Sequence, residues 1–266
     1  MCDNTIRKAC DAHGGAMRDG QRDDPAAARA VREADGDVEF QTDGTAVNTT
    51  AGWREMRLSA FAKRRRARPG GRRPAPHARV LTAGVAGCER LGPQWRRAAA
   101  RLGVRDAAEV TVIADGAKWI WAQAQQSLPG AAGVLDFDHA SERLDQAGRE
   151  LLGDTPAAAA GAEARRGTLL GSGGAALLAE RAAAGPAAAG ALEYVRPHAA
   201  HLDYPGRRAD GRSIGSGLVE GACQQVVGRR LKQTGARWRV RRADRMATLC
   251  GVIYSDLWDT YWHKAA

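Results

Sequence analysis

The fold is decided by a short stretch near residue 40, which reads Val38-Glu39-Phe40-Gln41-Thr42-Asp43. Val38, Phe40 and Thr42 alternate with the polar residues Glu39, Gln41 and Asp43. This two-residue period is typical of a strand with one apolar and one polar face, and Asp43 belongs to the polar face. The run from residue 53 to 61 alternates again after a turn-rich segment. We therefore expect the two runs to pair as an antiparallel hairpin.

Further elements follow this hairpin in a regular order. We expect a third strand over residues 79–85, a helix over 93–102, a fourth strand over 109–114, a short helix over 117–126 and a fifth strand over 133–135. This order is that of the ribonuclease-H-like fold, an α/β class with a mixed five-stranded sheet and flanking helices, in which the first and fourth strands are adjacent. That adjacency would bring Asp43 close to Asp115, which follows the fourth strand.

Composition divides the chain into four segments. Residues 1–36 are polar and glycine-rich, and we expect a loosely ordered lead-in or a truncated helical region. Residues 37–140 form the first part of the ribonuclease-H-like core. Residues 141–204, which include the Ala- and Gly-rich stretch 157–191, are expected to form a helical insertion. Residues 205–266 complete the core with a helix over 218–232, capped by the Ser216 side chain, and a final helix over 244–262.

The charge of the chain indicates a polyanionic partner. Forty Lys and Arg residues against 30 Asp and Glu residues give a net charge of +10 and a pI near 9.9, and nucleic acid is the commonest polyanion that such proteins bind. The basic residues gather over 63–73 and over 229–245. A solvated face is the alternative, but we expect the second group to contact DNA phosphates through Arg229, Arg230, Lys232, Arg237, Arg239 and Arg241.

Several classes of protein are disfavoured. No apolar run approaches the roughly 18 residues that a membrane span needs, and the N-terminal residues do not have the pattern of a signal peptide. Five cysteines without paired spacing argue against a disulfide framework or a zinc knuckle. The expected location is the cytoplasm, with no membrane partner.

Three carboxylates are candidates for a metal site: Asp43, Asp115 and Glu220. Two aspartates at the ends of neighbouring strands, joined by a glutamate from a helix packed on the sheet, could hold two divalent cations about 4 Å apart. Mg²⁺ suits oxygen ligands, with Mn²⁺ as the alternative. Such a site could activate a water or a DNA 3′-hydroxyl for in-line attack at phosphorus. The alternative is two ordinary turn aspartates and a solvated glutamate.

Around these carboxylates the chain resembles the DDE transposases of the ISKra family of bacterial insertion sequences. The similar motifs are residues 41–45 (QTDGT), 52–55 (GWRE), 114–121 (ADGAKWIW) and 213–223 (SIGSGLVEGAC), the last continuing through 226–238 (VVGRRLKQTGARW). The resemblance implies a catalytic core with a helical insertion before the glutamate and metal-dependent DNA strand cleavage and transfer. It also implies binding of transposon ends and target DNA by a homo-oligomer associated with the bacterial nucleoid.

A further motif lies just after the fifth strand. Asp136 and His139 resemble the Asp-x-x-His motif of related transposase groups, which implies a place beside the metal site, where they would position DNA or orient the ligands. The alternative is a helix start with a carboxylate at its positive end. Two other functions stay open for the whole chain: a catalytically inactive or truncated DNA-binding transposase remnant, and a ribonuclease-H-like nuclease without strand transfer.

Overall fold

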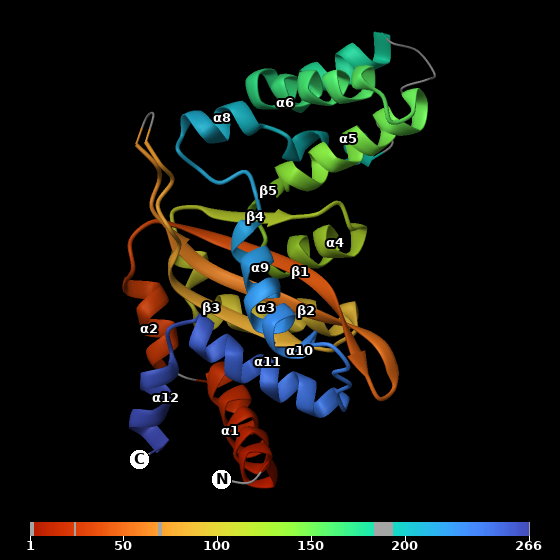
Figure 1. Ribbon diagram of the computed structural model, residues 1–266. Helices are drawn as coiled ribbons and strands as arrows, with labels where there is room; N and C mark the ends of the chain where they lie inside the picture. The colour runs from red at the N-terminus through yellow and green to blue at the C-terminus, as the bar shows by residue number, and fades with distance from the viewer. Residues whose placement is uncertain (1–2, 24, 69–70, 184–193, 266) are drawn as a thin grey trace.

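The computed structural model describes residues 3–23, 25–68, 71–183 and 194–265 (Figure 1). Its strands form one five-stranded sheet in the order β3-β2-β1-β4-β5. The strands are β1 (Asp37–Thr49), β2 (Gly52–Arg64), β3 (His77–Gly84), β4 (Val110–Ala114) and β5 (Ala132–Leu135). The pairs β1–β2 and β2–β3 are antiparallel, whereas β1–β4 and β4–β5 are parallel. This is an α/β fold with ribonuclease-H-like topology, and the expected adjacency of the first and fourth strands is confirmed.

Helices cover both faces of the sheet. In Figure 1, α3 and α4 lie on one face, α9, α10 and α11 lie on the other, and α5, α6 and α8 form a lobe beyond β5. The α-helices are α1 (Asp3–Asp23), α2 (Pro25–Glu33), α3 (Cys88–Arg101), α4 (Lys118–Ser127), α5 (Phe137–Leu152), α6 (Pro156–Ala183), α8 (Tyr204–Ala209), α9 (Gly217–Ala222), α10 (Arg229–Leu231), α11 (Val240–Tyr254) and α12 (Trp258–Ala265). Shorter segments are the 3₁₀ helices η1 (Val104–Asp106) and η3 (Arg196–His201) and the π-helical η4 (Cys223–Gly228).

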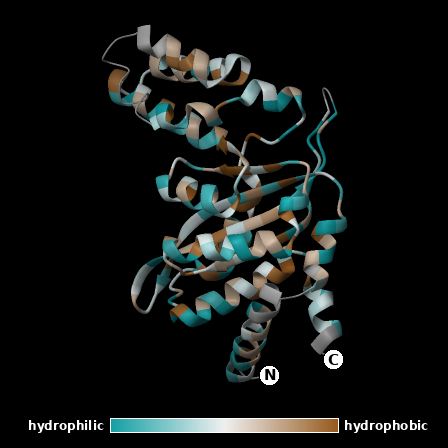
Figure 2. Cartoon of the chain, turned by 180° about the vertical axis from the view of Figure 1, so that it is seen from behind, coloured by the Kyte–Doolittle hydropathy of each residue, from teal (hydrophilic) through white to brown (hydrophobic). Residues whose placement is uncertain are grey.

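The alternation along β1 sorts its side chains between two cores. Val38 and Phe40 pack with Trp95 of α3 in one apolar cluster, and brown apolar residues run along the strands in Figure 2. On the opposite face, a second cluster joins β1, β2 and β3 to the helical run α9–η4–α10 and to α11. The polar face of β1 is therefore covered rather than solvated: Glu39 and Gln41 are 4% and 0% exposed.

Residues 1–36 differ from the expected loose lead-in. Their described part forms α1 and α2, and α1 packs along α11. Gly14 permits this contact, since a Cβ there would lie 2.7 Å from the carbonyl oxygen of Arg245. Asp11 adds ion pairs to Arg242 and Arg245, at 3.3 and 3.7 Å. The described part of this segment is thus helical, because tertiary contacts stabilise a segment that its composition disfavours.

Other boundaries also change. β1 continues six residues beyond Asp43, because the hairpin pairs as far as Thr49 and Gly52. The helix expected over 93–102 begins at Cys88, so Pro93 lies inside α3 rather than opening it. The expected final helix is two, α11 and α12, separated near Asp256, whose φ of 57° is left-handed.

The Ala- and Gly-rich stretch is helical where it is described. α6 spans most of it, with a kink at Gly173, whose φ is 78°, while residues 184–191 lie outside the described residues. Leu169 and Leu177 of α6 pack with Leu144 of α5 and with Val134 of β5. The helical lobe is therefore attached to the edge of the sheet at β5. Within the described ranges, no helix is long and apolar enough to cross a membrane.

Candidate active site

Two of the predicted carboxylates come from the adjacent strands β1 and β4. The parallel register aligns Gln41 with Ile113, and the same register two residues further on would align Asp43 with Asp115. Asp115 follows the end of β4 as expected, but Asp43 lies within β1 and not at its end. The topology thus brings these side chains to the same part of the sheet, although 72 positions separate them.

Local hydrogen bonds hold one oxygen of each aspartate. Asp43 Oδ1 accepts from the backbone N–H of Gly44 at 2.6 Å, while its Oδ2 lies 3.6 Å from the Cys223 thiol. Asp115 Oδ1 accepts from the N–H of Ala117 at 2.9 Å, and the indole of Trp121 donates to the Asp115 carbonyl at 2.9 Å. Each side chain is therefore oriented through one oxygen.

Glu220 is held at the start of α9. The Ser216 hydroxyl donates to Glu220 Oε1 at 2.6 Å. This corrects the expected cap: Ser216 does occupy the N-cap position, but its side chain bonds Glu220 and makes no capping hydrogen bond to the helix backbone. Instead of one regular helix over 218–232, α9 continues through the π-helical η4 into α10. π-Helical turns widen a helix locally and are frequent at functional sites.

Asp136 and His139 lie beside Glu220. Asp136 is fully buried. Its Oδ1 accepts from the backbone N–H of His139 at 2.7 Å and lies 3.0 Å from the Nδ1 atom of the His139 ring. Its Oδ2 accepts from the backbone N–H of Ser216 at 2.5 Å. Asp136 is thus the N-cap of α5, which is one of the two alternatives that the sequence left open. It also binds the Ser216 backbone in the loop that precedes Glu220. Ligand atoms of Asp136, His139 and Glu220 lie within 4.8 Å of one another.

Asp43 and Asp115 lie outside this close group but within its electrostatic reach. The hydrogen bond to Asp136 raises the pKa of His139 to about 9 despite partial burial, and the charges of Asp136, Asp115 and Asp43 add to this effect. Burial of Asp136 acts against ionisation, but hydrogen bonds from His139 and Ser216 outweigh it and lower its pKa. At neutral pH a protonated imidazole therefore stands among several carboxylates.

Cys223 connects this cluster to the second core. Burial raises the pKa of its thiol, and the charges of Asp43 and Glu220 raise it further. The thiol is therefore neutral at physiological pH and serves as an apolar neighbour of Asp43.

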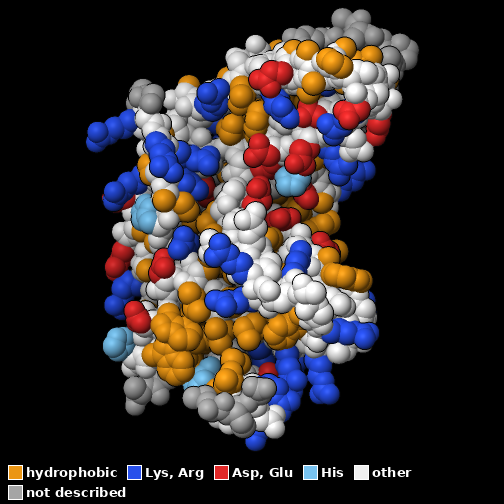
Figure 3. All heavy atoms as spheres, in the orientation of Figure 1, with side chains coloured by type: hydrophobic (Ala, Val, Ile, Leu, Met, Phe, Trp, Pro, Cys, Tyr) orange, Lys and Arg blue, Asp and Glu red, His pale blue; other side chains and the backbone are white. Residues whose placement is uncertain are grey.

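The predicted DNA-contacting residues lie on the same side of the molecule as α9 and α10. Lys232 donates to the hydroxyl of Thr45 at 2.5 Å, two residues beyond Asp43. All six predicted side chains are exposed, and across the described ranges none has a carboxylate within 4.0 Å: Arg229, Arg230, Lys232, Arg237, Arg239 and Arg241. Figure 3 shows acidic side chains grouped beside a histidine, with basic side chains around them.

The earlier basic run has a different role. Arg64 is buried and pairs with Glu39 at 2.9 Å, while Arg66 pairs with Asp37 at 2.8 Å. These arginines are neutralised within the protein. They therefore contribute less than the second group to a phosphate-binding surface.

Sequence reasoning missed several residues that shape the site. The Tyr194 hydroxyl accepts from the N–H of Gly116 at 3.1 Å, directly after Asp115. Glu39 accepts from Ser213 as well as from Arg64, which joins β1 to the segment before α9. The one sequence signal for the contacts of Glu39 was an acidic residue inside the β1 strand. No sequence pattern around Tyr194 indicated that its hydroxyl would contact Gly116.

Comparison with known proteins adds no assignment: no protein-family model matches the chain, and no curated protein matches it significantly.

Proposed function

We propose that the protein is a DDE transposase that cuts and joins DNA by two-metal-ion phosphoryl transfer, with Asp43, Asp115 and Glu220 as metal ligands. The observation that carries the proposal is the group of Asp136, His139 and Glu220, whose ligand atoms lie within 4.8 Å of one another, with exposed cations on α10. Asp43 and Asp115 lie outside this group but near enough for their charges to act on His139. Carboxylates provide ligands for the metal, and cations attract the substrate, so both halves of the requirement are present. The motif resemblance to ISKra-family transposases supports the same assignment.

The three proposed ligands suit a hard divalent cation by donor type, and Glu220 alone of them belongs to the group whose ligand atoms lie within 4.8 Å of one another. Asp43, Asp115 and Glu220 each have one oxygen held by a hydrogen bond from N–H or O–H, while the described residues give no such bond to the second oxygen, apart from the weak thiol contact of Asp43. Hard oxygen ligands of this kind suit Mg²⁺ or Mn²⁺. When bound, two such ions would lower the pKa of an attacking water or 3′-hydroxyl and neutralise charge on the leaving oxygen.

The chain's own residues would bind and orient the DNA. Arg229, Arg230 and Lys232 would contact backbone phosphates and hold the scissile bond over the carboxylates. His139, protonated because of Asp136, would donate a hydrogen bond to a phosphate oxygen. Asp136 would keep this imidazole in place and fix the Ser216 loop that positions Glu220. The helical insertion expected over residues 141–204 would comprise most of α5 and all of α6.

The test is a cleavage assay on a supercoiled plasmid that carries the DNA flanking the coding sequence. Nicking that requires Mg²⁺ and falls to background in Asp43→Asn, but persists in the exposed control Asp259→Asn, supports the proposal. Joining of the cut ends to a second plasmid distinguishes a transposase from a nuclease of the same fold. Binding without nicking at any Mg²⁺ or Mn²⁺ concentration would contradict the catalytic assignment and identify a DNA-binding remnant.

A further inference from the structure

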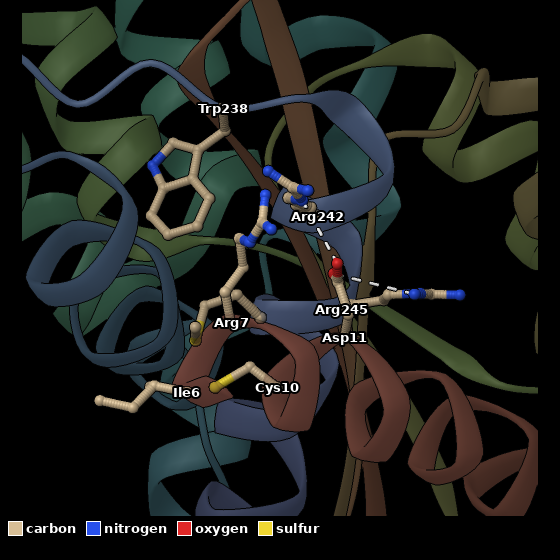
Figure 4. Close-up of a pocket in the computed structure, with 8 residues that line it drawn as sticks. Ile6, Arg7, Cys10, Asp11, Trp238, Arg242 and Arg245 are labelled. Atoms are coloured by element: carbon tan, nitrogen blue, oxygen red, sulfur yellow. Dashed lines mark hydrogen bonds and ion pairs between the residues drawn. The ribbon is translucent and has the colours of Figure 1, made fainter. Parts of the chain in front are cut away.

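A cavity of about 260 Å³ lies between α1 on one side and Trp238 and α11 on the other (Figure 4). The indole of Trp238 forms one wall, and Ile6, Cys10 and Met246 supply apolar surface around it. This volume falls just below the range of about 300–1,000 Å³ typical of drug-sized ligand pockets. The cavity therefore suits one small planar group rather than a large ligand.

Trp238 is held in position without any ligand. Its indole N–H donates to the Leu231 carbonyl at 3.1 Å, its backbone N–H donates to the Asn48 carbonyl at 3.1 Å, and its carbonyl accepts from Thr50 at 2.8 Å. These bonds tie the aromatic ring to both α10 and the β1–β2 hairpin. A planar ligand could stack on a ring fixed in this way at little cost in side-chain ordering.

The rim of the cavity is cationic. Arg7, Arg242 and Arg245 line it together with one carboxylate, Asp11, which pairs with the last two. Three guanidinium groups against one carboxylate leave an excess of positive charge. Arg237 and Arg239, on either side of Trp238, are exposed and extend this charge toward the proposed DNA surface.

We propose that this cavity binds one unpaired nucleobase of the DNA, stacked on Trp238, with the flanking phosphates held by the arginines. The inference rests on the proposed function only in taking DNA as the partner. An aromatic wall, a small apolar interior and a cationic rim are the features that single-stranded nucleic-acid sites combine. The base would leave the stack next to the basic residues that follow Glu220, which gives the protein a way to recognise distorted or unpaired DNA.

The test compares binding to a fully paired duplex and to the same duplex with one unpaired thymine, in EDTA so that no cleavage occurs. We expect wild-type protein to prefer the unpaired thymine by roughly 5- to 140-fold, the range for one base stacked on an aromatic side chain. Trp238→Ala should abolish this preference, and Trp238→Phe should keep most of it. Trp53→Ala, which removes an exposed tryptophan outside the cavity, is the matched control and should behave as wild type.

A second variant and a direct readout guard against misfolding of Trp238→Ala. Cys10→Tyr, which would fill the cavity while leaving the Trp238 hydrogen bonds intact, should also abolish the preference. An unpaired 5-iodouracil at the thymine position should photocrosslink to the peptide that contains Trp238. An unchanged preference in both variants, or a crosslink elsewhere, would overturn the proposal, as would loss of the preference through a change in oligomeric state. Nicking that survives without any Trp238-dependent preference would refute the cavity's role alone, whereas a Trp238-dependent preference without nicking would refute catalysis alone.

Discussion

Asp136→Ala should both destabilise the protein and displace Glu220, because one buried carboxylate serves two structural elements. It caps α5 through the N–H of His139 and holds the N–H of Ser216. Loss of an N-cap costs about 1 kcal/mol, and a buried N–H left without a partner costs about 2 kcal/mol. The free energy of unfolding should therefore fall by about 3 kcal/mol, which lowers the Tm of a chain of this length by about 6–12 °C.

Asp138→Ala provides the matched control for this experiment. Asp138 lies two positions away and is exposed, and its pKa is raised by partial burial and by repulsion from Asp136 and Glu142. Removal of Asp138 should change the free energy of unfolding by no more than about 0.5 kcal/mol. Urea denaturation followed by circular dichroism measures both variants, and the plasmid assay measures nicking. A loss of less than about 1 kcal/mol in the free energy of unfolding of Asp136→Ala, or a loss no larger than that of Asp138→Ala, would show that the hydrogen bonds to Asp136 do not stabilise the protein as proposed.

Three further predictions concern other groups. Glu39→Ala should lower the free energy of unfolding by about 3–5 kcal/mol, because it leaves the buried Arg64 without its ion-pair partner. Asp35→Ala removes the partner of Arg65 in an exposed pair and should lower it by less than about 1 kcal/mol. Equal losses in urea denaturation would contradict this. In metal-free protein, NMR should show His139 titrating near pH 9. The stability that its hydrogen bond to Asp136 contributes should therefore be complete below about pH 6.5 and be lost as the pH rises through 9. Titration near pH 6.5 would disprove the pairing. Arg230→Ala should reduce the slope of log affinity for duplex DNA against log salt by about 0.9, and an unchanged slope would remove Arg230 from the interface.

The sequence predicted the sheet well because the alternation is local. Val38 and Phe40 show a two-residue period whether or not the chain is folded, and the same is true of the run that becomes β2. The extension of β1 beyond Asp43 was not visible, because residues 44–49 are ordered by pairing with β2. For residues 1–36 the sequence left a loose lead-in and a helical region as alternatives for a related reason: the stability of α1 comes from contact with α11, more than 200 positions away.

The sequence suggested candidate residues for the site but not the hydrogen bonds that connect them. Asp136 offered two alternatives in the sequence, a helix cap or a neighbour of the metal site, and in the structure the cap also contacts the Glu220 loop. The sequence could not decide between them, because the contact joins Asp136 to Ser216, which lies 80 positions further along the chain and comes close only in the folded protein. The Ser216 side chain likewise had two possible partners: a backbone N–H of α9, from which its oxygen would accept as a cap, and the Glu220 carboxylate, to which its hydroxyl donates. Only the bond to Glu220 is formed.

The polar face of β1 explains how Glu220 is positioned. Glu39 and Gln41 point to the same face as Asp43, and both are buried under the segment that leads into α9. Glu39 accepts from the Ser213 hydroxyl, and Gln41 Oε1 accepts from the backbone N–H of Val219 at 3.1 Å. Buried polar groups without these partners would each cost about 1–3 kcal/mol, so the segment cannot shift along β1 without leaving them unpaired. The strand that supplies Asp43 therefore also fixes the helix that supplies Glu220, through the hydrogen bonds that Glu39 and Gln41 accept.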